Sequence, residues 1–310
     1  MTNTRTDPEV SIQNPKTIGV LGLGNMGSGI ARNLAKSQFI TTGYDPITHK
    51  VDDLVADGLH ARSSAAEVGK DADAVFVMVM AASDAHEALF GEDGLCTTLQ
   101  PGATVIITAT FHPHEVVEIA EQLHRRGYHV IDTPVSGGYP GAQGGTLTLM
   151  TSAPDDLLAA NRPVLEAISA SIHHVGSEPG MGQTVKACLQ SLLGSIFSAT
   201  MEAVVMAAKA GVPGQTALDV FSTSSGGSPL MQGCIEKMID REFEGGGSHI
   251  ATMHKDLTIS TSFAQKLGVP LFTASMAMQL FQSGITRYPD GDNWVITKIL
   301  EDIAQVEVSR

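Results

Sequence analysis

A glycine-rich hexamer near the start of the chain constrains the fold more than any other stretch. The hexamer, residues 22–27 (GLGNMG), follows a short apolar run, Lys16–Leu21, that is typical of a buried parallel strand. A helical pattern, Gly29–Ser37, comes next, and a second strand pattern, Phe39–Tyr44, ends at Asp45. A G-x-G-x-x-G hexamer alone arises by chance. Between a strand and a helix, with an acid about 20 residues further on, it predicts a Rossmann dinucleotide-binding domain.

Each glycine of the hexamer has its own mechanical reason. Gly22 permits the tight turn, Gly24 lets backbone N–H groups approach a pyrophosphate, and Gly27 lets helix and strand pack closely. The helix N-terminus adds the positive end of its dipole. The alternative is a glycine turn that merely joins strand to helix. We expect the dinucleotide to contact Gly22, Leu23, Gly24, Asn25, Met26 and Gly27.

Asp45 bears on which dinucleotide binds. A carboxylate accepts hydrogen bonds from both ribose hydroxyls and repels a 2′-phosphate. No arginine follows at Pro46 or Ile47, and Lys50 is the nearest cation. The sequence therefore predicts NAD as the cofactor in preference to NADP, with Asp45 on the ribose.

The alternation of strand and helix patterns continues along the first half of the chain. Ala74–Met80 is a continuous apolar run, the mark of a strand covered on both faces. Thr104–Ile107 and His129–Asp132 are further strand patterns, and between them Pro113 opens a helix that runs to about Arg126. The last strand pattern is Ser171–Val175.

Only helical patterns follow that strand. They lie at Gln183–Lys209, Thr216–Ser222, Leu230–Ile239, Ala251–Leu267, Phe272–Ser283 and Trp294–Ala304. We therefore predict an α/β fold: a flexible tail over residues 1–15, an NAD-binding Rossmann domain over 16–177, and an all-helical substrate and oligomerisation domain over 178–310. A long interdomain helix begins the second domain.

Residues at two strand ends are candidate ligand contacts. Thr110 is either an ordinary turn residue or a hydroxyl at the carboxyl edge of the sheet, where cofactors lie. Five glycines after Asp132 predict a loop whose backbone amides face a ligand. In that loop Ser136, Gly137 and Gly138 can offer one hydroxyl and successive N–H groups to a carboxylate. The alternative for this segment is a flexible hairpin loop.

The long helix carries one lysine, Lys186, in otherwise apolar surroundings. Gln190 follows four residues later, so both side chains share one face of the helix. The lysine either extends to solvent at the helix end or sits in a cleft, where its proton is available to a reacting oxygen.

Four motifs in this order resemble the β-hydroxyacid dehydrogenase family, which includes 3-hydroxyisobutyrate dehydrogenase, tartronate semialdehyde reductase and threonate dehydrogenase. They are GLGNMG at residues 22–27, DTPVSGGYPGAQGGTL at 132–147, GMGQTVKACLQ at 180–190, and Lys255-Asp256-Leu257. The resemblance covers nearly the whole chain from about Lys16. It implies that Lys186 is the catalytic lysine, that Thr110 and Lys255 line the cofactor site, and that the substrate-binding loop contains Ser136, Gly137 and Gly138.

Two positions depart from the family pattern. Gln190 stands where most members have asparagine, and glutamine there is similar to the threonate dehydrogenase branch. Tyr139-Pro140 occupies a loop position that smaller residues usually take. Both departures concern the identity of the substrate and leave the chemistry unchanged.

The resulting hypothesis is an NAD(P)-dependent oxidoreductase that acts on a CH–OH group. NAD takes a hydride from a small hydroxy acid while Lys186 serves as general acid/base, the serine-glycine loop holds the carboxylate, and Gln190 binds a hydroxyl or carboxylate oxygen. A threonate-like four-carbon sugar acid is favoured, and a 3-hydroxyisobutyrate or tartronate-semialdehyde type of enzyme is the alternative. A non-catalytic NAD-binding sensor is a second alternative. A third is imine reduction, and the presence of Lys186 counts against it.

Composition and spacing exclude several other classes. The net charge of −14 argues against nucleic acid or an anionic membrane as a partner. No apolar run approaches the roughly 20 residues of a membrane span. The polar N-terminus lacks a signal-peptide core, and three scattered cysteines fit buried thiols of a cytoplasmic protein. The histidines show no metal-ligand spacing, so no metal is expected. The long apolar helix suggests a homodimer or homotetramer.

Overall fold

The computed structural model describes residues 15–310. Nearly all of the tail predicted over residues 1–15 therefore lies outside the described residues. Within them the chain forms two compact units, one ending at Lys186 and the other beginning at Ala187.

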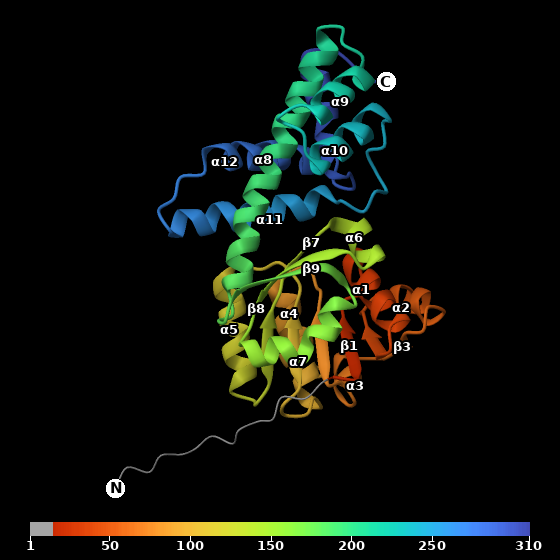
Figure 1. The fold of residues 1–310 in the computed structure, drawn as a ribbon, viewed down its shortest axis with the longest axis vertical. Helices are drawn as coiled ribbons and strands as arrows, with labels where there is room; N and C mark the ends of the chain where they lie inside the picture. The colour runs from red at the N-terminus through yellow and green to blue at the C-terminus, as the bar shows by residue number, and fades with distance from the viewer. Residues whose placement is uncertain (1–14) are drawn as a thin grey trace. The chain divides into compact units, whose positions relative to one another are not determined.

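The first unit is built on one mixed sheet with helices on both faces (Figure 1). Its spatial order is β3-β2-β1-β4-β5-β6-β8-β7, and β9 pairs with β8. The neighbouring strands from β3 to β6 are parallel, β8 is antiparallel to β6 and β7, and β9 is parallel to β8. The strands are β1 (Thr17–Leu21), β2 (Ile40–Tyr44), β3 (His60–Ala61), β4 (Ala74–Val77), β5 (Thr104–Ile107), β6 (His129–Asp132), β7 (Val135–Ser136), β8 (Leu147–Ser152) and β9 (Ser169–Gly176).

Two apolar cores cover the faces of this sheet. On β4, Phe76 belongs to one core, while Val75 and Val77 belong to the other, and all three are fully buried. This alternation explains why the strand reads as a continuous apolar run. The helical elements of this unit are α1 (Asn25–Lys36), α2 (Thr48–Val55), α3 (Ala65–Gly69), α4 (Ala82–Phe90), the 3-10 turn η1 (Leu95–Thr97), α5 (Pro113–His124), α6 (Gly138–Gly144) and α7 (Asp155–Glu166).

The predicted bounds of three elements are wrong by more than two residues. One is the helix predicted over Phe272–Ser283, which runs to Arg287. The strand expected at Ala74–Met80 ends at Val77 because its neighbours end beside it: Leu21 and Ile107 both pair with Val77. Helix α1 begins at Asn25, four residues before the predicted start at Gly29, because the glycine turn itself delivers the chain into the helix.

The segment predicted as a loop after Asp132 contains regular structure. It includes the short strand β7 and the helix α6, which packs on α1. Gly29 of α1 permits this contact, since a Cβ at that position would lie 2.5 Å from the backbone of Ala142. Five glycines in sixteen residues hide the helix from propensity arguments, because packing and not propensity stabilises it.

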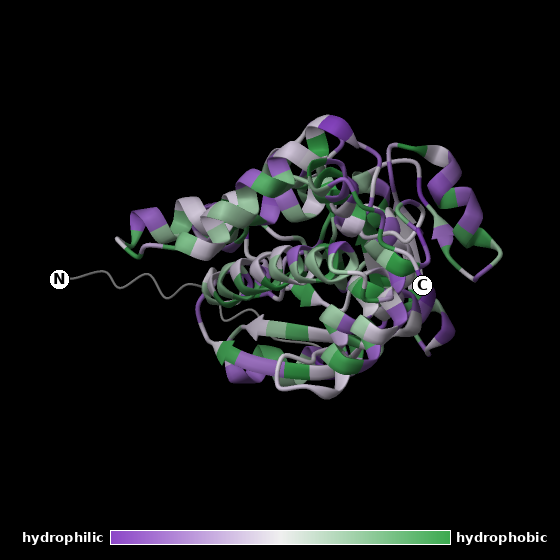
Figure 2. Cartoon of the chain, turned by 90° about the horizontal axis from the view of Figure 1, so that it is seen from above, coloured by the Kyte–Doolittle hydropathy of each residue, from purple (hydrophilic) through white to green (hydrophobic). Residues whose placement is uncertain are grey.

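The second unit is helical, as predicted. Its core includes Phe197 and Phe281, whose rings meet edge to face with centroids 6.3 Å apart. In Figure 2 many helices carry green hydrophobic and purple hydrophilic residues along one ribbon, as expected of helices with a buried and an exposed face. The helical elements are α8 (Met181–Lys209, whose first turns belong to the first unit), α9 (Gly214–Thr223), α10 (Pro229–Ile239), α11 (Ile250–Lys266), α12 (Phe272–Arg287), η2 (Asn293–Ile296) and α13 (Thr297–Ala304).

Helix α8 contains a longer apolar stretch than the sequence analysis expects. Among the described residues it is the one helix with the length and composition to cross a membrane. In the structure 33% of its most apolar window is buried, and core helices of soluble proteins pass the same test. Length and composition therefore do not by themselves assign this helix to a membrane.

Candidate active site

The glycine hexamer forms the turn between β1 and α1, and its three glycines differ in their surroundings. Gly22 has φ +87°, and a Cβ there would lie 2.4 Å from the carbonyl oxygen of Met78. A Cβ on Gly27 would lie 1.8 Å from the carbonyl oxygen of Gly22. A Cβ on Gly24 would meet nothing within 4 Å. Gly22 and Gly27 are thus required by the fold, whereas Gly24 borders open space, as the predicted approach of a pyrophosphate requires.

Asp45, at the end of β2, holds this turn from the side. Its Oδ2 accepts a hydrogen bond from the Leu23 N–H at 2.8 Å, and its Oδ1 accepts one from the Ile47 N–H at 2.9 Å. Lys50 Nζ lies 3.8 Å from Oδ1, and the aspartate is buried. Each carboxylate oxygen keeps a second lone pair, so Asp45 can still accept from ribose hydroxyls.

Thr110 lies between β5 and α5, at the carboxyl edge of the sheet, and is half-buried. Its two neighbours are fixed by Gln183 in the first turn of α8: the Phe111 N–H donates to Gln183 Oε1, and Gln183 Nε2 donates to the Ala109 carbonyl, both at 3.0 Å. The residues around Thr110 are therefore held to the start of α8.

Asp132 closes β6 with a fully buried carboxylate. It accepts hydrogen bonds from the Gly180 N–H at 2.8 Å and from Gln183 Nε2 at 3.0 Å. Burial raises the pKa of this carboxyl from 3.8 to about 6, and the hydrogen bonds from the start of α8 partly offset that rise.

Lys186 does not extend to solvent. Only 6% of it is exposed, and its Nζ donates a hydrogen bond to the Val135 carbonyl at 2.8 Å. Val135 directly precedes Ser136, so the ammonium is tied to the backbone of the candidate substrate loop. Its apolar neighbours on the helix are not fully buried: Cys188 is exposed and Val185 is half-buried.

The loop residues Gly137 and Gly138 have φ values of +127° and +59°, which favour glycine. Both are exposed, and Ser136 is half-buried. They lead into α6, which is fastened to α1 by Asn33: its Nδ2 donates to the carbonyls of Ala142 at 2.9 Å and Gln143 at 3.2 Å. The candidate carboxylate loop is thus anchored on the helix that follows the glycine hexamer.

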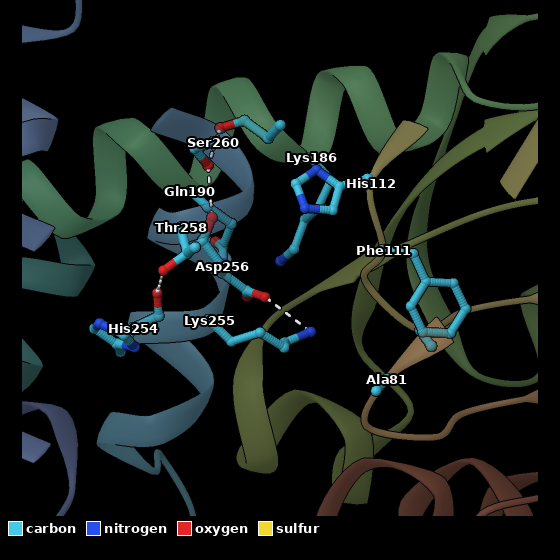
Figure 3. Close-up of polar contacts among 12 residues, drawn as sticks. Ala81, Phe111, His112, Lys186, Gln190, His254, Lys255, Asp256, Thr258 and Ser260 are labelled. Carbon is cyan, nitrogen blue, oxygen red and sulfur yellow. Dashed lines mark hydrogen bonds and ion pairs between the residues drawn. The ribbon is translucent and has the colours of Figure 1, made fainter. Parts of the chain in front are cut away.

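Gln190 and Lys255 belong to the second unit and meet through Asp256. The Gln190 Nε2 donates to Asp256 Oδ2, and Lys255 Nζ lies 3.1 Å from Asp256 Oδ1 (Figure 3). Gln190 and Asp256 are both buried, and Gln190 Oε1 has no hydrogen-bond partner among the described residues. The aspartate therefore orients the Gln190 amide so that, in the described part of the chain, its nitrogen is hydrogen-bonded and its oxygen is not.

Known protein families and proteins are similar to this chain over most of its length. The NAD binding domain of 6-phosphogluconate dehydrogenase matches residues 17–176, and the NAD-binding domain of NADP-dependent 3-hydroxyisobutyrate dehydrogenase matches residues 180–300. An L-threonate dehydrogenase from Escherichia coli is 33% identical, over 92% of this chain and 95% of its own. The chain belongs to the β-hydroxyacid dehydrogenase family. It is an NAD-binding oxidoreductase of CH–OH groups.

One more protein and one solved structure are similar to this β-hydroxyacid dehydrogenase over most of its length. An NAD-dependent L-serine dehydrogenase from Pseudomonas aeruginosa is 31% identical, over 92% of this chain and 98% of its own. The crystal structure of a 3-hydroxyisobutyrate dehydrogenase from Salmonella typhimurium superposes with a TM-score of 0.85 at 31% identity, covering 91% of this chain and 99% of that one. The family prediction and the nearness to the threonate branch are confirmed.

Sequence reasoning missed three polar residues in this dehydrogenase. In the sequence, Asp132, Gln183 and Asp256 stand inside the motifs but carry no predicted role of their own. Each is a buried polar side chain beside a predicted site residue, and burial is the property that a single sequence does not display. The expectation of three buried thiols is wrong for Cys96, which is half-buried, and for Cys188, which is exposed.

Proposed function

We propose that this enzyme oxidises the hydroxyl group of a small hydroxy acid, a threonate-like four-carbon sugar acid being favoured, with Lys186 as general acid/base. The observation that carries this proposal is the buried Lys186 amine, which donates to the carbonyl just before the serine-glycine loop. A lysine at that position stands within one residue of the groups proposed to hold the substrate carboxylate.

The proposed chemistry divides between the two ends of the substrate. Ser136 and the N–H groups of Gly137 and Gly138 bind the carboxylate, which fixes the carbon that faces the nicotinamide. Lys186 takes the proton of the hydroxyl as the carbonyl forms, and returns one in the reverse direction. When bound through the glycine hexamer, Asp45, Thr110 and Lys255, NAD supplies the hydride acceptor.

The amide polarity of Gln190 narrows the substrate. A carboxylate only accepts hydrogen bonds, so the amide nitrogen must face Asp256 and Oε1 is left as an acceptor. The sequence alone allowed Gln190 to meet a hydroxyl or a carboxylate oxygen. Because Oε1 has no hydrogen-bond partner within residues 15–310, it supports a substrate hydroxyl as donor, and it would repel a second carboxylate. This supports a polyhydroxy acid over a substrate with an apolar branch, such as 3-hydroxyisobutyrate.

One alternative function uses the same chemistry on another substrate, and the other has no catalysis. A 3-hydroxyisobutyrate or tartronate-semialdehyde type of reaction would use the same lysine and the same loop. A sensor that binds NAD without turnover is disfavoured because the relatives above are named as dehydrogenases.

We also propose a role for the helical domain, an oligomeric state and a cellular location. We place the domain boundary after residue 177, with the helical domain serving substrate binding and assembly into a homodimer or homotetramer. Exposed apolar side chains support assembly: Met206 is 71%, Phe272 81% and Met276 72% exposed. Three free cysteines support a reducing, cytoplasmic location.

Replacement of the lysine tests the proposed function. Lys186→Arg should lower kcat by at least about a thousandfold, because arginine does not release its proton. NADH formation is measured with L-threonate, L-serine, 3-hydroxyisobutyrate and glycerate, each with NAD and with NADP, and NADH binding is measured by fluorescence. We expect L-threonate with NAD to give the highest kcat/KM in the wild type. Near-wild-type turnover in a folded Lys186→Arg variant would contradict the general acid/base role.

A further inference from the structure

A buried polar cluster lies beneath the first turn of α8 and takes no part in the chemistry proposed above. At its centre, the Asp132 carboxylate accepts from the Gly180 N–H at 2.8 Å, from the Gln183 N–H at 3.3 Å and from Gln183 Nε2 at 3.0 Å. Asp132 is 0% exposed and Gln183 1%. A buried carboxylate is costly to retain, and an apolar pair of similar volume would pack the same space more simply.

Both ends of the Gln183 side-chain amide are hydrogen-bonded. While Nε2 donates to both Asp132 and the Ala109 carbonyl, Oε1 accepts from the Phe111 N–H. Ala109 and Phe111 flank Thr110. One amide thus links the end of β6, the segment after β5 and the start of α8.

The backbone next to Gln183 packs closely against the ends of β6 and β8. Gly180 has φ +97°, and a Cβ on Gly182 would lie 2.6 Å from the Met150 carbonyl oxygen and 2.8 Å from that of Asp132. Lys186 follows Gln183 by three residues, less than one helical turn. Because a helix transmits a shift of its first turn to the next, whatever fixes Gln183 also fixes the base of the lysine side chain.

We propose that Asp132 and Gln183 are positioning residues: they set the first turn of α8 so that the Lys186 amine meets the Val135 carbonyl, and they register the Thr110 segment against it. The inference rests on the proposed role of Lys186. Its physical reason is that proton transfer is sensitive to distance, and a displacement of about 1 Å can cost on the order of a hundredfold in rate.

Three variants form the test: Asp132→Asn, Gln183→Glu and the two combined. In Asp132→Asn the new N–H₂ group faces another donor in either orientation: the Gln183 side-chain N–H₂, or the backbone N–H groups of Gly180 and Gln183. In Gln183→Glu two carboxylates face each other. The combined variant again places a donor opposite an acceptor. Each single variant should lose roughly ten- to a hundredfold in kcat. The combined variant should have a kcat about tenfold higher than either single variant. Its kcat should stay below that of the wild type, because a glutamate at position 183 cannot donate to the Ala109 carbonyl.

The isotope effect separates positioning from simple loss of folded enzyme. The substrate is L-threonate deuterated at the carbon that is oxidised, or whichever acid in the substrate panel gives the highest kcat/KM. The primary isotope effect on kcat should rise in both single variants, because a misplaced base slows the chemical step. The Kd of NADH should change much less than kcat, because the hydrogen bonds of the pair reach only the Thr110 segment of the proposed cofactor site. A smaller fraction of active enzyme would lower kcat and leave the isotope effect unchanged.

Thr133→Val is the matched control. Thr133 follows Asp132, and its hydroxyl shares a 2.8 Å hydrogen bond with that of Thr151; both threonines are fully buried. It should lower thermal stability with no change in the isotope effect. The inference is overturned if the single variants keep wild-type kcat and isotope effect, if the combined variant is no faster than they are, or if Thr133→Val raises the isotope effect as well. An active Lys186→Arg enzyme would instead overturn the proposed function itself.

Discussion

Gly24 and Gly27 belong to the same hexamer, yet a methyl group has opposite consequences at the two positions. Gly24→Ala adds a Cβ in open space at a backbone conformation that alanine adopts readily, so unfolding free energy should change by less than about 1 kcal/mol. The added methyl would stand where the pyrophosphate must approach, and the Kd of NADH should rise at least about tenfold. Gly27→Ala places its Cβ 1.8 Å from a carbonyl oxygen and should destabilise the fold by more than about 3 kcal/mol.

Urea unfolding and NADH fluorescence titration measure the two effects separately. A Gly24→Ala protein that binds NADH as the wild type does would show that the open space beside Gly24 is not the cofactor site. A Gly27→Ala protein of wild-type stability would show that the turn can relax.

Asp132 also makes a prediction about pH. Its pKa is raised from 3.8 to about 6 by burial, so between these values the native protein binds a proton that the unfolded chain has released. The stability it contributes is therefore fully present below about pH 4 and is lost as the pH rises through 6, a change on the order of 3 kcal/mol. Asp132→Asn lacks this titration. The destabilisation caused by that substitution should be largest near pH 4 and shrink toward pH 7.

Other carboxylates titrate in the same range, so the quantity to compare is the wild-type minus variant difference in urea midpoint, followed by circular dichroism from pH 4 to pH 7.5. Thr133→Val, which removes a neighbouring buried hydrogen bond without removing a charge, should show a difference that is constant with pH. A wild-type minus Asp132→Asn difference that grows with pH would mean that the carboxylate is stabilised, not penalised, by its surroundings.

Among the strands and helices, those with one clear hydrophobic periodicity could be predicted from the sequence. Those that depend on contacts with residues distant in the sequence could not. β5 and β6 have the predicted bounds: their central residues are apolar, and all eight residues are buried except the half-buried His129. β8 was not predicted, because Leu147–Ser152 (LTLMTS) is neither a continuous apolar run nor a strict alternation, and it directly follows a glycine-rich segment. α6 escaped for a related reason: Asn33 and Gly29 on α1 stabilise it from about 110 positions away in sequence.

The same distinction holds for the candidate site. Lys186, Ser136 and Asp45 stand at positions that motifs and their spacing identify. Their partners do not: Asp256 lies 66 positions from Gln190, and Asp132 lies 51 positions from Gln183. A hydrogen bond between such residues leaves no periodicity in a single sequence, and it appears only when the fold is known.

On the scale of the whole molecule, a net charge of −14 opposes self-association, so an assembly of this chain needs apolar surface to hold it together. Phe272 and Met276 provide such surface in the second unit: they are four apart on α12, share one face of that helix and are 81% and 72% exposed. Light scattering on the wild type should give a mass that is a multiple of 32.5 kDa. Phe272→Ser with Met276→Ser should lower that mass while leaving the thermal midpoint of the dissociated chain nearly unchanged, because neither side chain is buried within it. Ile303→Ser, an exposed apolar position on α13, is the control and should keep the wild-type mass. If the double variant keeps the full mass, the α12 surface is not the contact between copies.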